Sequence, residues 1–408
     1  MILKKYGFIF IAVVLIIIGL TVVLLSDPYR FRPEPQMNEA KYSLEKKDTS
    51  KISPVKPMHN KKALPDNLRR IYDVTDKYIS LDSAESFWLD NVSNSDFKIV
   101  LNAYLYDHPE VFWIDSSSLY SYYETDSGIE VELKFSMSGE KLNSAKKELD
   151  AAVKKAFTYV PDTADDLELE VFINDYIVNH CKYNSDAAMC HSAYGALVKG
   201  EAVCDGYSKA FQVLCCKAGI ECAIAEGTSD FNEDSGTGHM WNFVKLGENW
   251  YNTDVTWNDI DSAKFFCERY LFLNLTDSDI KKNHKFSPLY TDADINGNTT
   301  FNIFMPECGS EELRYINICC AVISDIEDDS EPIASLIKNA RNEEKSCAFV
   351  IDKKFSYNEI CDKLISGGYI NEWINGANHY LSGKKIGMDT KAYTYPNQGI
   401  VIVELNYE

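Results

Sequence analysis

The chain has 408 residues and a formal net charge of -21, with 41 Lys and Arg against 62 Asp and Glu. Hydrophobic residues make up 45% and charged residues 25%, a balance typical of a globular protein that excludes a largely disordered or collagen-like chain. The acidity argues against nucleic acid as the main partner, because a nucleic-acid-binding face is basic. At about 150 residues per domain, the length predicts two or three domains.

The charge is distributed unevenly along the chain. Residues 1–66 carry 11 Lys and Arg against 6 Asp and Glu, a net of +5. Residues 67–408 carry 30 against 56, a net of -26. The sequence therefore predicts a basic N-terminal segment followed by an acidic body.

Residues 7–25 contain no charged side chain. A helix of that length spans about 28 Å, close to the roughly 30 Å of a bilayer core. Lys4 and Lys5 precede the run and favour a cytoplasmic N-terminus. A cleaved signal peptide would have a shorter apolar region and a small-x-small site, which residues 23–28 do not offer. Residues 1–25 are therefore predicted to be an uncleaved transmembrane signal anchor, with the body outside the cytoplasm.

The region after the anchor divides into a linker and a first folded domain. Residues 26–63 contain five prolines, many lysines and no apolar periodicity, which indicates a flexible basic linker. Residues 64–160 are predicted to form an N-terminal α+β domain without a catalytic motif. Its expected helices are 64–78, 96–106 and 138–157, and its expected strands are 111–114, 119–124 and 129–135. Asp107 and His108 are interpreted as a helix end.

The rest of the chain divides at about residue 290. Residues 161–290 are predicted to contain helices at 165–181, 191–198 and 204–218, the last closed by Gly219, and strands at 221–226, 239–246 and 250–257. Residues 291–408 alternate as a C-terminal α/β domain. Its expected strands are 315–323, 347–351, a short one near 392 and 400–405, and its helices are 331–342, 357–365 and 370–381. The overall fold class is α+β.

A cysteine at the start of a predicted helix is the first candidate for chemistry. Cys204 lies in the run GEAVCDGY, residues 200–207, where a loop leads into the helix. The unpaired N–H groups and the dipole at a helix start stabilise a thiolate. Gly200 and Gly206 allow a close approach of backbone segments. This setting is typical of a nucleophilic cysteine.

A histidine and an aspartate follow at suitable spacings. His239 starts one predicted strand and Asp254 lies on the next. A type II′ turn at residues 247–248 would place Asp254 opposite Trp241, and therefore diagonal to His239. Diagonal neighbours lie about 7–8 Å apart, within reach of their side chains. The carboxylate would then orient the imidazole, and the imidazole would activate Cys204.

Three sequence blocks, in this order, resemble one family. They read G-x-x-V-C-x-G-Y at Cys204, G-H-x-W-N at His239 and W-Y-x-x-D-x-T-W at Asp254. Together they resemble the transglutaminase-like core, a relative of papain-type cysteine peptidases, over about residues 175–275, and they point to its membrane-anchored bacterial members. Met240 departs from the pattern, since the family often has alanine there. The larger side chain would narrow the site.

The resemblance implies a papain-like, transglutaminase-like catalytic domain over residues 161–290. In it, Cys204 would be the nucleophile, His239 the general base and acid, and Asp254 the residue that orients His239. The implied chemistry is acyl transfer from a protein or peptide amide through a Cys204 thioester, which an amine or water resolves. No cofactor is implied. The backbone N–H of Cys204 is one candidate donor to the oxyanion.

Three aromatic residues are weaker candidates for substrate binding. Tyr194 is a candidate for the second oxyanion donor, and Trp241 and Trp257 for the walls of a substrate cleft. For both tryptophans, packing in the core of the hairpin is the alternative interpretation.

The twelve cysteines leave the redox state open. Cysteine-rich extracellular proteins typically form disulfides, but none of these residues lies in a CxxC pair, and several lie in apolar runs where thiols behave as small hydrophobes. His180, Cys181, Cys190 and His191 allow independent packing, a 181–190 disulfide or a zinc site. We favour independent packing and expect no metal, because each adjacent pair would have to point both side chains at one ion.

The sequence therefore predicts a membrane-anchored, extracytoplasmic cysteine enzyme with transglutaminase, deamidase or protease-like activity. Its expected partners are protein or peptide substrates at the cell surface or cell wall, and the membrane through its N-terminal helix. The alternative hypothesis is a non-catalytic protein- or cell-wall-binding module on the same fold. A third is a structural envelope protein whose cysteines form only disulfides.

Overall fold

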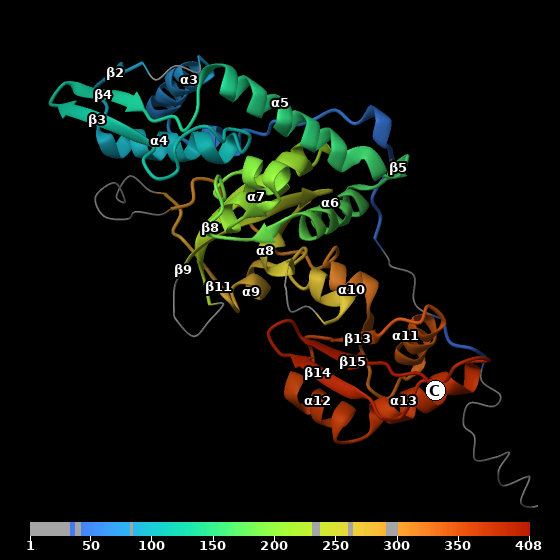
Figure 1. Cartoon of the computed structure of the whole chain (residues 1–408). Coiled ribbons are helices and arrows are strands. Elements are labelled where there is room, and N and C mark those ends of the chain that lie inside the picture. The colour runs from blue at the N-terminus through green and yellow to red at the C-terminus, as the bar shows by residue number, and fades with distance from the viewer. Residues whose placement is uncertain (1–32, 37–41, 82–84, 231–236, 260–263, 291–300) are drawn as a thin grey trace, which may run out of the picture. The chain divides into compact units, whose positions relative to one another are not determined.

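The computed structural model describes residues 33–36, 42–81, 85–230, 237–259, 264–290 and 301–408 (Figure 1). Contacts divide the chain into two compact units. One comprises Lys41–Ile318, and the other Cys319–Glu408 with the N-terminal segment Met1–Ala40. The expected boundaries at residues 160 and 290 therefore fall inside the first unit. The physical reason is a shared core, since one hydrophobic cluster runs from Leu64 to Leu313.

The N-terminal part of the first unit is a small sheet with helices. The three strands are antiparallel in the order β2-β4-β3, and α3 packs against α4. Ser93 and Asp96 form a capping box that starts α4. The elements are α3 (Asp66–Ser80), β2 (Phe87–Asp90), α4 (Asn94–Asp107), β3 (Tyr120–Thr125), β4 (Gly128–Leu133), α5 (Gly139–Ala156) and η2 (Phe157–Tyr159).

An antiparallel sheet in the order β10-β9-β8-β11 forms the second part of this unit. Helix α7 packs on β8 and β9, and α6 packs on α7 (Figure 1). The elements are β5 (Thr163–Ala164), α6 (Asp166–His180), β6 (Lys182–Tyr183), the π-helix η3 (Gly195–Lys199), β7 (Glu201–Ala202), α7 (Cys204–Lys217), β8 (Cys222–Ser229), β9 (Thr237–Leu246), β10 (Asn249–Thr253), α8 (Val255–Asn258), η4 (Phe266–Tyr270), α9 (Asp277–Ile280), β11 (His284–Phe286) and α10 (Tyr315–Cys319).

Several predicted elements differ from the structure. The strand expected at 250–257 ends at Thr253, because the Asp254 side chain caps the short helix α8. The strand expected at 111–114 is reduced to a bridge between Ile114 and Phe135. The strand expected at 315–323 is split into α10 and a short strand, and the helix expected at 191–198 is the π-helix η3. Strand β2 was not predicted.

The linker expected over residues 26–63 also differs, because residues 42–63 lie against the first unit. Strand β1 (Lys47–Asp48) pairs with β5, and the Val55 N–H donates to the Cys216 carbonyl at 2.9 Å. Lys47 Nζ contacts Asp166 at 2.7 Å. The turn η1 (Thr49–Lys51) and helix α2 (His59–Ala63) complete the segment. Apolar side chains such as Leu44 and Ile52 join the core, which holds this stretch in place.

The second unit is a four-stranded sheet with three helices and its own hydrophobic cluster. The strand order is β12-β13-β15-β14, with β12 and β13 parallel and the other pairs antiparallel. In the described N-terminal segment of this unit, Glu34 forms an ion pair with Arg341 at 2.6 Å. The elements are β12 (Ala321–Ile323), α11 (Ser330–Arg341), β13 (Ser346–Ile351), α12 (Tyr357–Ile365), α13 (Tyr369–Tyr380), β14 (Lys391–Tyr395) and β15 (Ile400–Glu404).

The transmembrane anchor predicted over residues 1–25 lies outside the described residues. Among the helices that the structure does describe, none has both the length and the hydropathy of a membrane span.

Candidate active site

Cys204 is the first residue of α7, and its side chain is half-buried. The N-cap residue of this helix is Val203, which supplies no side-chain hydrogen bond, in contrast to the capping boxes of α4 and α6. A helix start without such a cap keeps backbone N–H groups available for a thiolate or an anionic ligand. The structure thus provides the setting that the sequence predicted for a nucleophilic cysteine.

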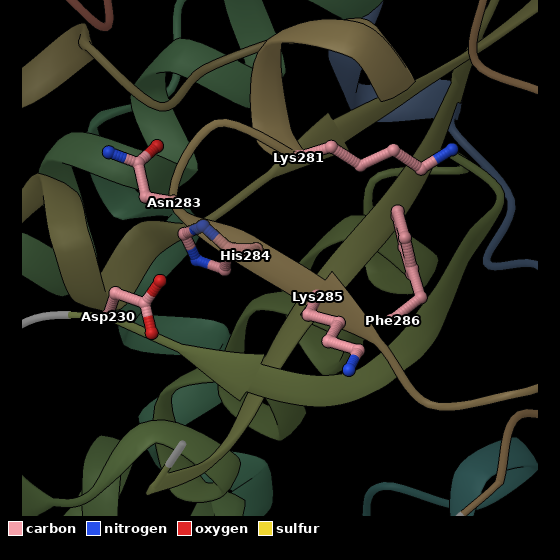
Figure 2. Close-up of a pocket in the computed structure, with 6 residues that line it drawn as sticks. All are labelled: Asp230, Lys281, Asn283, His284, Lys285 and Phe286. Carbon is pink, nitrogen blue, oxygen red and sulfur yellow. The ribbon is translucent and has the colours of Figure 1, made fainter. Parts of the chain in front are cut away.

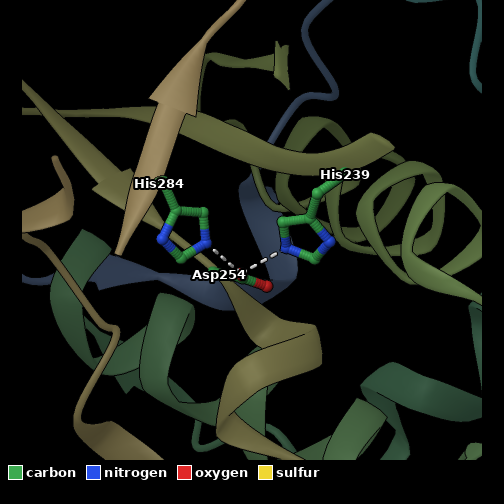
Figure 3. Close-up of side chains that lie close together, drawn as sticks. All are labelled: His239, Asp254 and His284. Carbon is green, nitrogen blue, oxygen red and sulfur yellow. Dashed lines mark hydrogen bonds and ion pairs between the residues drawn. The ribbon is translucent and has the colours of Figure 1, made fainter. Parts of the chain in front are cut away.

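The predicted partners of Cys204 lie together. His239 Nε2–H donates to Asp254 Oδ2 at 2.7 Å, and both side chains are buried (Figure 3). The hairpin register is the predicted one, since Leu246 pairs with Asn249 and Thr253 with Asn242. Asp254 follows directly after Thr253 and so reaches His239 from the neighbouring strand. Cys204 is close enough to His239 to contribute to the raised pKa of the imidazole.

Opposing effects set the charges of this pair. Burial lowers the pKa of His239, but the charge and hydrogen bond of Asp254 and the interaction with Cys204 raise it well above the usual range. Burial raises the pKa of Asp254, but the charge and hydrogen bond of His239 and the hydrogen bond of His284 bring it well below the usual range. The site therefore holds an ionised carboxylate beside a protonated imidazole.

The two tryptophans considered for a substrate cleft surround the imidazoles. The ring of Trp241 lies 6.0 Å from that of His239, and its Nε1–H donates to Asn252 Oδ1 at 3.1 Å. Trp241 is fully buried, so it offers no surface to a substrate, and the packing interpretation describes its position. Trp257 lies 6.1 Å from His239 and is 9% exposed, at the edge of the same aromatic group.

Tyr194, considered as an oxyanion donor, has another partner. Its hydroxyl donates to Glu148 Oε2 at 2.5 Å, and its ring stacks on Phe112. The Tyr194 hydroxyl is thus bound to Glu148 on α5 and is not available as a donor to an oxyanion. Tyr183 is a further tyrosine near Cys204, because β6 pairs in parallel with β7 and sets Tyr183 opposite Ala202, two residues before Cys204. The sequence analysis did not single out Tyr183, since a lone tyrosine after a helix carries no distinctive signal.

A second histidine, His284, also bonds Asp254 and was missed by the sequence analysis. Its Nε2–H donates to Asp254 Oδ2 at 2.9 Å (Figure 3). The residue belongs to the three-residue strand β11, and the surrounding sequence KKNHKFSP reads as a loop. Only the pairing of β11 with β8 brings His284 to the site.

The side chains of His239, Asp254 and His284 also have the spacing of a candidate metal site, with ligand atoms within 4.8 Å of one another. Direct hydrogen bonds of 2.7 and 2.9 Å already join the carboxylate to both imidazoles. Those bonds require a proton on each Nε2, the atom that a metal ion would need free. We therefore interpret the cluster as hydrogen-bonded.

The four residues around the loop at 181–190 each have a different partner. The Cys181 thiol donates to the Lys182 carbonyl, and the Cys190 thiol to the Ser185 carbonyl. His180 Nε2 lies 2.9 Å from the Leu197 carbonyl, and His191 Nδ1 lies 3.0 Å from Asp205 Oδ1. In the described part of the chain, which includes all twelve cysteines, no disulfide bond is formed.

A buried carboxyl group lies next to the Asp254 turn. Glu170 on α6 is fully buried and accepts hydrogen bonds from Thr253 Oγ1 at 3.0 Å and from Asn274 Nδ2 at 2.7 Å. Burial raises the pKa of Glu170 to about 7, although both hydrogen bonds act in the opposite direction. Ionised Glu170 therefore destabilises the fold.

We expect Glu170→Gln to flatten the pH dependence of stability. The pKa of Glu170 rises from an ordinary 4.5 to about 7 on folding, so its contribution is fully present below pH 4.5 and is lost as the pH rises through 7. The loss amounts to about 3 kcal/mol. Glutamine keeps both contacts, because its amide can donate to Thr253 Oγ1 while its carbonyl accepts from Asn274. Urea unfolding at pH 5 and pH 8 measures the difference.

Glu140→Gln, at an exposed position of α5, is the control for that experiment. It should keep the wild-type dependence of the free energy of unfolding on pH. Equal pH slopes for wild type and Glu170→Gln would contradict the prediction.

The family comparison agrees with this geometry. Residues 154–255 match the model of the transglutaminase-like superfamily, and this range contains Cys204, His239 and Asp254. The chain thus carries a transglutaminase-like domain, and members of this superfamily are generally cysteine-dependent enzymes. No curated protein matches the chain.

Three solved structures are similar to part of the chain. A candidate cysteine protease from Cytophaga hutchinsonii is 14% identical over 35% of this chain and 62% of its own, with a TM-score of 0.23. A structure described as a TGase is 13% identical over 45% and 54%, with a TM-score of 0.26. A candidate protease from Parabacteroides distasonis is 13% identical over 34% and 30%, with a TM-score of 0.20. The match spans less than two thirds of each of these proteins.

Proposed function

We propose that this protein is a cysteine-dependent acyl-transfer enzyme that acts on protein or peptide amides, as a transglutaminase, deamidase or protease. One observation carries the proposal: the buried His239–Asp254 pair lies beside Cys204, at the uncapped start of α7. A protonated imidazole next to a cysteine at a helix start favours a thiolate, which is the nucleophile of such enzymes.

In the proposed reaction each residue has a role. His239 Nε2 is bound to Asp254, so Nδ1 is the ring nitrogen that remains for Cys204. The thiolate attacks the amide carbonyl carbon, and the tetrahedral intermediate collapses as Nδ1–H protonates the leaving amine or ammonia. A thioester remains on Sγ. Nδ1 then takes a proton from the attacking amine or water, which releases a new amide or an acid and restores the thiolate.

The intermediate requires donors to its oxyanion. The backbone N–H of Cys204, at the first position of α7, is one, because it has no carbonyl partner within the helix. The Tyr183 hydroxyl is our candidate for the second. Burial and then the charge of Cys204 raise the pKa of Tyr183, so this hydroxyl stays protonated as a donor beside the nucleophile.

We further propose that the enzyme is anchored in the cell membrane with its body outside the cytoplasm. The support is the uncharged run at residues 7–25 with Lys4 and Lys5 before it. Protein or peptide substrates at the cell surface or wall would then be within reach. The acidic body favours amine-bearing substrates. A reporter fused after Leu25 should be active only outside the cytoplasm, and cytoplasmic activity would refute the anchor.

Thiol reactivity tests the enzymatic proposal. With the full chain at pH 6.5, we expect iodoacetamide to alkylate Cys204 at least about tenfold faster than Cys216, measured by peptide mass spectrometry. Cys216 is a half-buried cysteine on the same helix whose pKa is raised by burial, so it is a matched control. An equal or slower rate at Cys204 would refute an activated nucleophile.

The type of acyl transfer requires a second assay. Incorporation of a fluorescent primary amine into glutamine peptides would indicate a transglutaminase, ammonia release alone a deamidase, and peptide cleavage a protease. Cys204→Ala should abolish whichever activity is found, whereas Cys216→Ala should retain it. Activity that survives Cys204→Ala would refute the thioester mechanism.

A further inference from the structure

Asp254 carries more hydrogen bonds than the orientation of one histidine requires. Its Oδ2 accepts from His239 Nε2 at 2.7 Å and from His284 Nε2 at 2.9 Å, so two imidazoles converge on one oxygen (Figure 3). Its Oδ1 accepts the backbone N–H groups of Thr256 at 3.0 Å and Trp257 at 3.2 Å. All four contacts are donated to the carboxylate, which keeps it ionised in a fully buried position.

The direction of these bonds fixes the tautomers of both histidines. An ionised carboxylate only accepts, so each imidazole must carry a proton on Nε2. For His284, the other nitrogen, Nδ1, is buried and has no hydrogen-bond partner among the described residues. A proton there would be a buried donor without an acceptor, which is costly. His284 is therefore assigned as the neutral Nε2–H form.

Aromatic side chains pack around the imidazole of His284 and restrict its orientation. Its ring lies 5.0 Å from that of Trp241, 4.5 Å from Trp257 and 6.0 Å from Phe272. His284 also lines a pocket of about 460 Å³ whose wall includes Asp230 and Asn283 (Figure 2). The aromatic rings limit rotation of the imidazole, so its Nε2–H points at Asp254.

Other titratable groups lie near the cluster or line the pocket beside His284. They come from α7, from β6 and from the wall of the pocket that His284 lines, and they are Cys204, Tyr183, Asp230, Lys281 and Lys285. None of these directly bonds the Asp254 carboxylate in the described part of the chain. The two histidines are thus its only titratable hydrogen-bond partners there.

We infer that His284 is a positioning residue of the catalytic site, whose Nε2–H fixes the Asp254 carboxylate so that its Oδ2 stays aimed at His239. The inference rests on the proposed function for its catalytic consequence. If only His239 bonded Oδ2, the carboxylate could turn about its side-chain bond and weaken its hold on the imidazole. With two fixed imidazoles on Oδ2 and two backbone groups on Oδ1, it has one orientation.

Two matched variants separate the hydrogen bond from mere packing. In His284→Gln the amide nitrogen lies near the position of Nε2 and can donate a hydrogen bond to Asp254. In His284→Asn the amide nitrogen lies near the position of Nδ1, and the shorter side chain does not reach Asp254. We expect the glutamine variant to stay within about threefold of wild type. The asparagine variant should lose about 10- to 100-fold in kcat, with KM little changed. Lys285→Ala, the exposed next residue, should behave as wild type.

Two further readouts on the full chain do not need a substrate. The rate of Cys204 alkylation by iodoacetamide at pH 7 should fall in the asparagine variant and recover in the glutamine variant. In the proton NMR spectrum, the low-field Nε2–H resonance of His239 should move in the asparagine variant. Thermal unfolding, followed in parallel, shows that each variant is folded.

These outcomes distinguish the two proposals. If wild type transfers no acyl group but Cys204 alkylation follows the glutamine and asparagine pattern, acyl transfer fails and the role of His284 stands. If wild type is active and the two variants are equally active or equally impaired, or if KM alone rises, His284 is only a packing residue. An unmoved His239 resonance in folded His284→Asn would overturn the inference as well.

Discussion

Asp254→Asn is expected to lower kcat/KM by about 10⁴-fold while leaving Cys204 in place. The carboxylate accepts four N–H groups, two on each oxygen, so the amide nitrogen of asparagine must face two donors in either orientation. With that nitrogen toward the imidazoles, His239 relieves the conflict by losing its Nε2 proton. The neutral ring then keeps its proton on Nδ1 and can no longer take the proton of Cys204. Steady-state kinetics on whichever substrate the amine-incorporation, ammonia-release or peptide-cleavage assay identifies measure the loss.

The matched control for this substitution is Asp230→Asn. Asp230 is exposed and lies on the wall of the pocket beside His284, but it makes no side-chain contact with the Asp254 carboxylate in the described structure. It should keep wild-type kinetics. If kcat/KM fell by less than tenfold in Asp254→Asn, the Asp254 carboxylate would not be required to orient His239.

Gly206→Ala is expected to destabilise the protein by about 3 kcal/mol and to remove most activity. A Cβ atom at this position would lie 2.3 Å from the Cys190 carbonyl oxygen and 2.8 Å from Ala202 Cβ. The carbonyl oxygen belongs to backbone that cannot swing aside, because it also accepts the Val203 N–H at 3.1 Å. The first turn of α7 would have to shift, and Cys204 with it. Urea unfolding and the alkylation rate of Cys204 measure the two effects.

Gly238→Ala serves as the matched glycine control. Gly238 directly precedes His239, and a Cβ atom there would meet nothing within 4 Å. It should change neither stability nor the alkylation rate. If Gly206→Ala were as stable and as reactive as Gly238→Ala, the close packing of residues 190 and 202 on α7 would not be required.

Local patterns were enough to predict the parts of the site that lie close in sequence. The glycine turn at residues 247–248 set the register of β9 and β10, and the predicted pairing of Leu246 with Asn249 is confirmed. That register alone brings Asp254 to His239. The helix start at Cys204 was likewise readable, because a run of loop residues gives way to a helical apolar pattern at that point.

Two features of the structure differ from the prediction, one for a local reason and one because of long-range packing. Asp254 was expected within a strand but instead caps α8, because its Oδ1 accepts two backbone N–H groups that a helix start leaves unpaired. Residues 42–63 were expected to be flexible, but their few apolar side chains meet a core built from residues more than a hundred positions later. Neither the cap at Asp254 nor the packing of residues 42–63 can be predicted from the composition of these segments.

By itself, the sequence predicted the α+β class and the three candidate catalytic residues, Cys204, His239 and Asp254, because their placement depends on a helix start and a single hairpin whose geometry is local. Only the tertiary structure decided which other side chains reach them. His284 comes from a three-residue strand thirty positions after Asp254, and Glu170 from a helix that precedes it by eighty-four. Sheet order and helix packing, which arise from burial of the whole core, bring these residues to one carboxylate and its neighbouring turn.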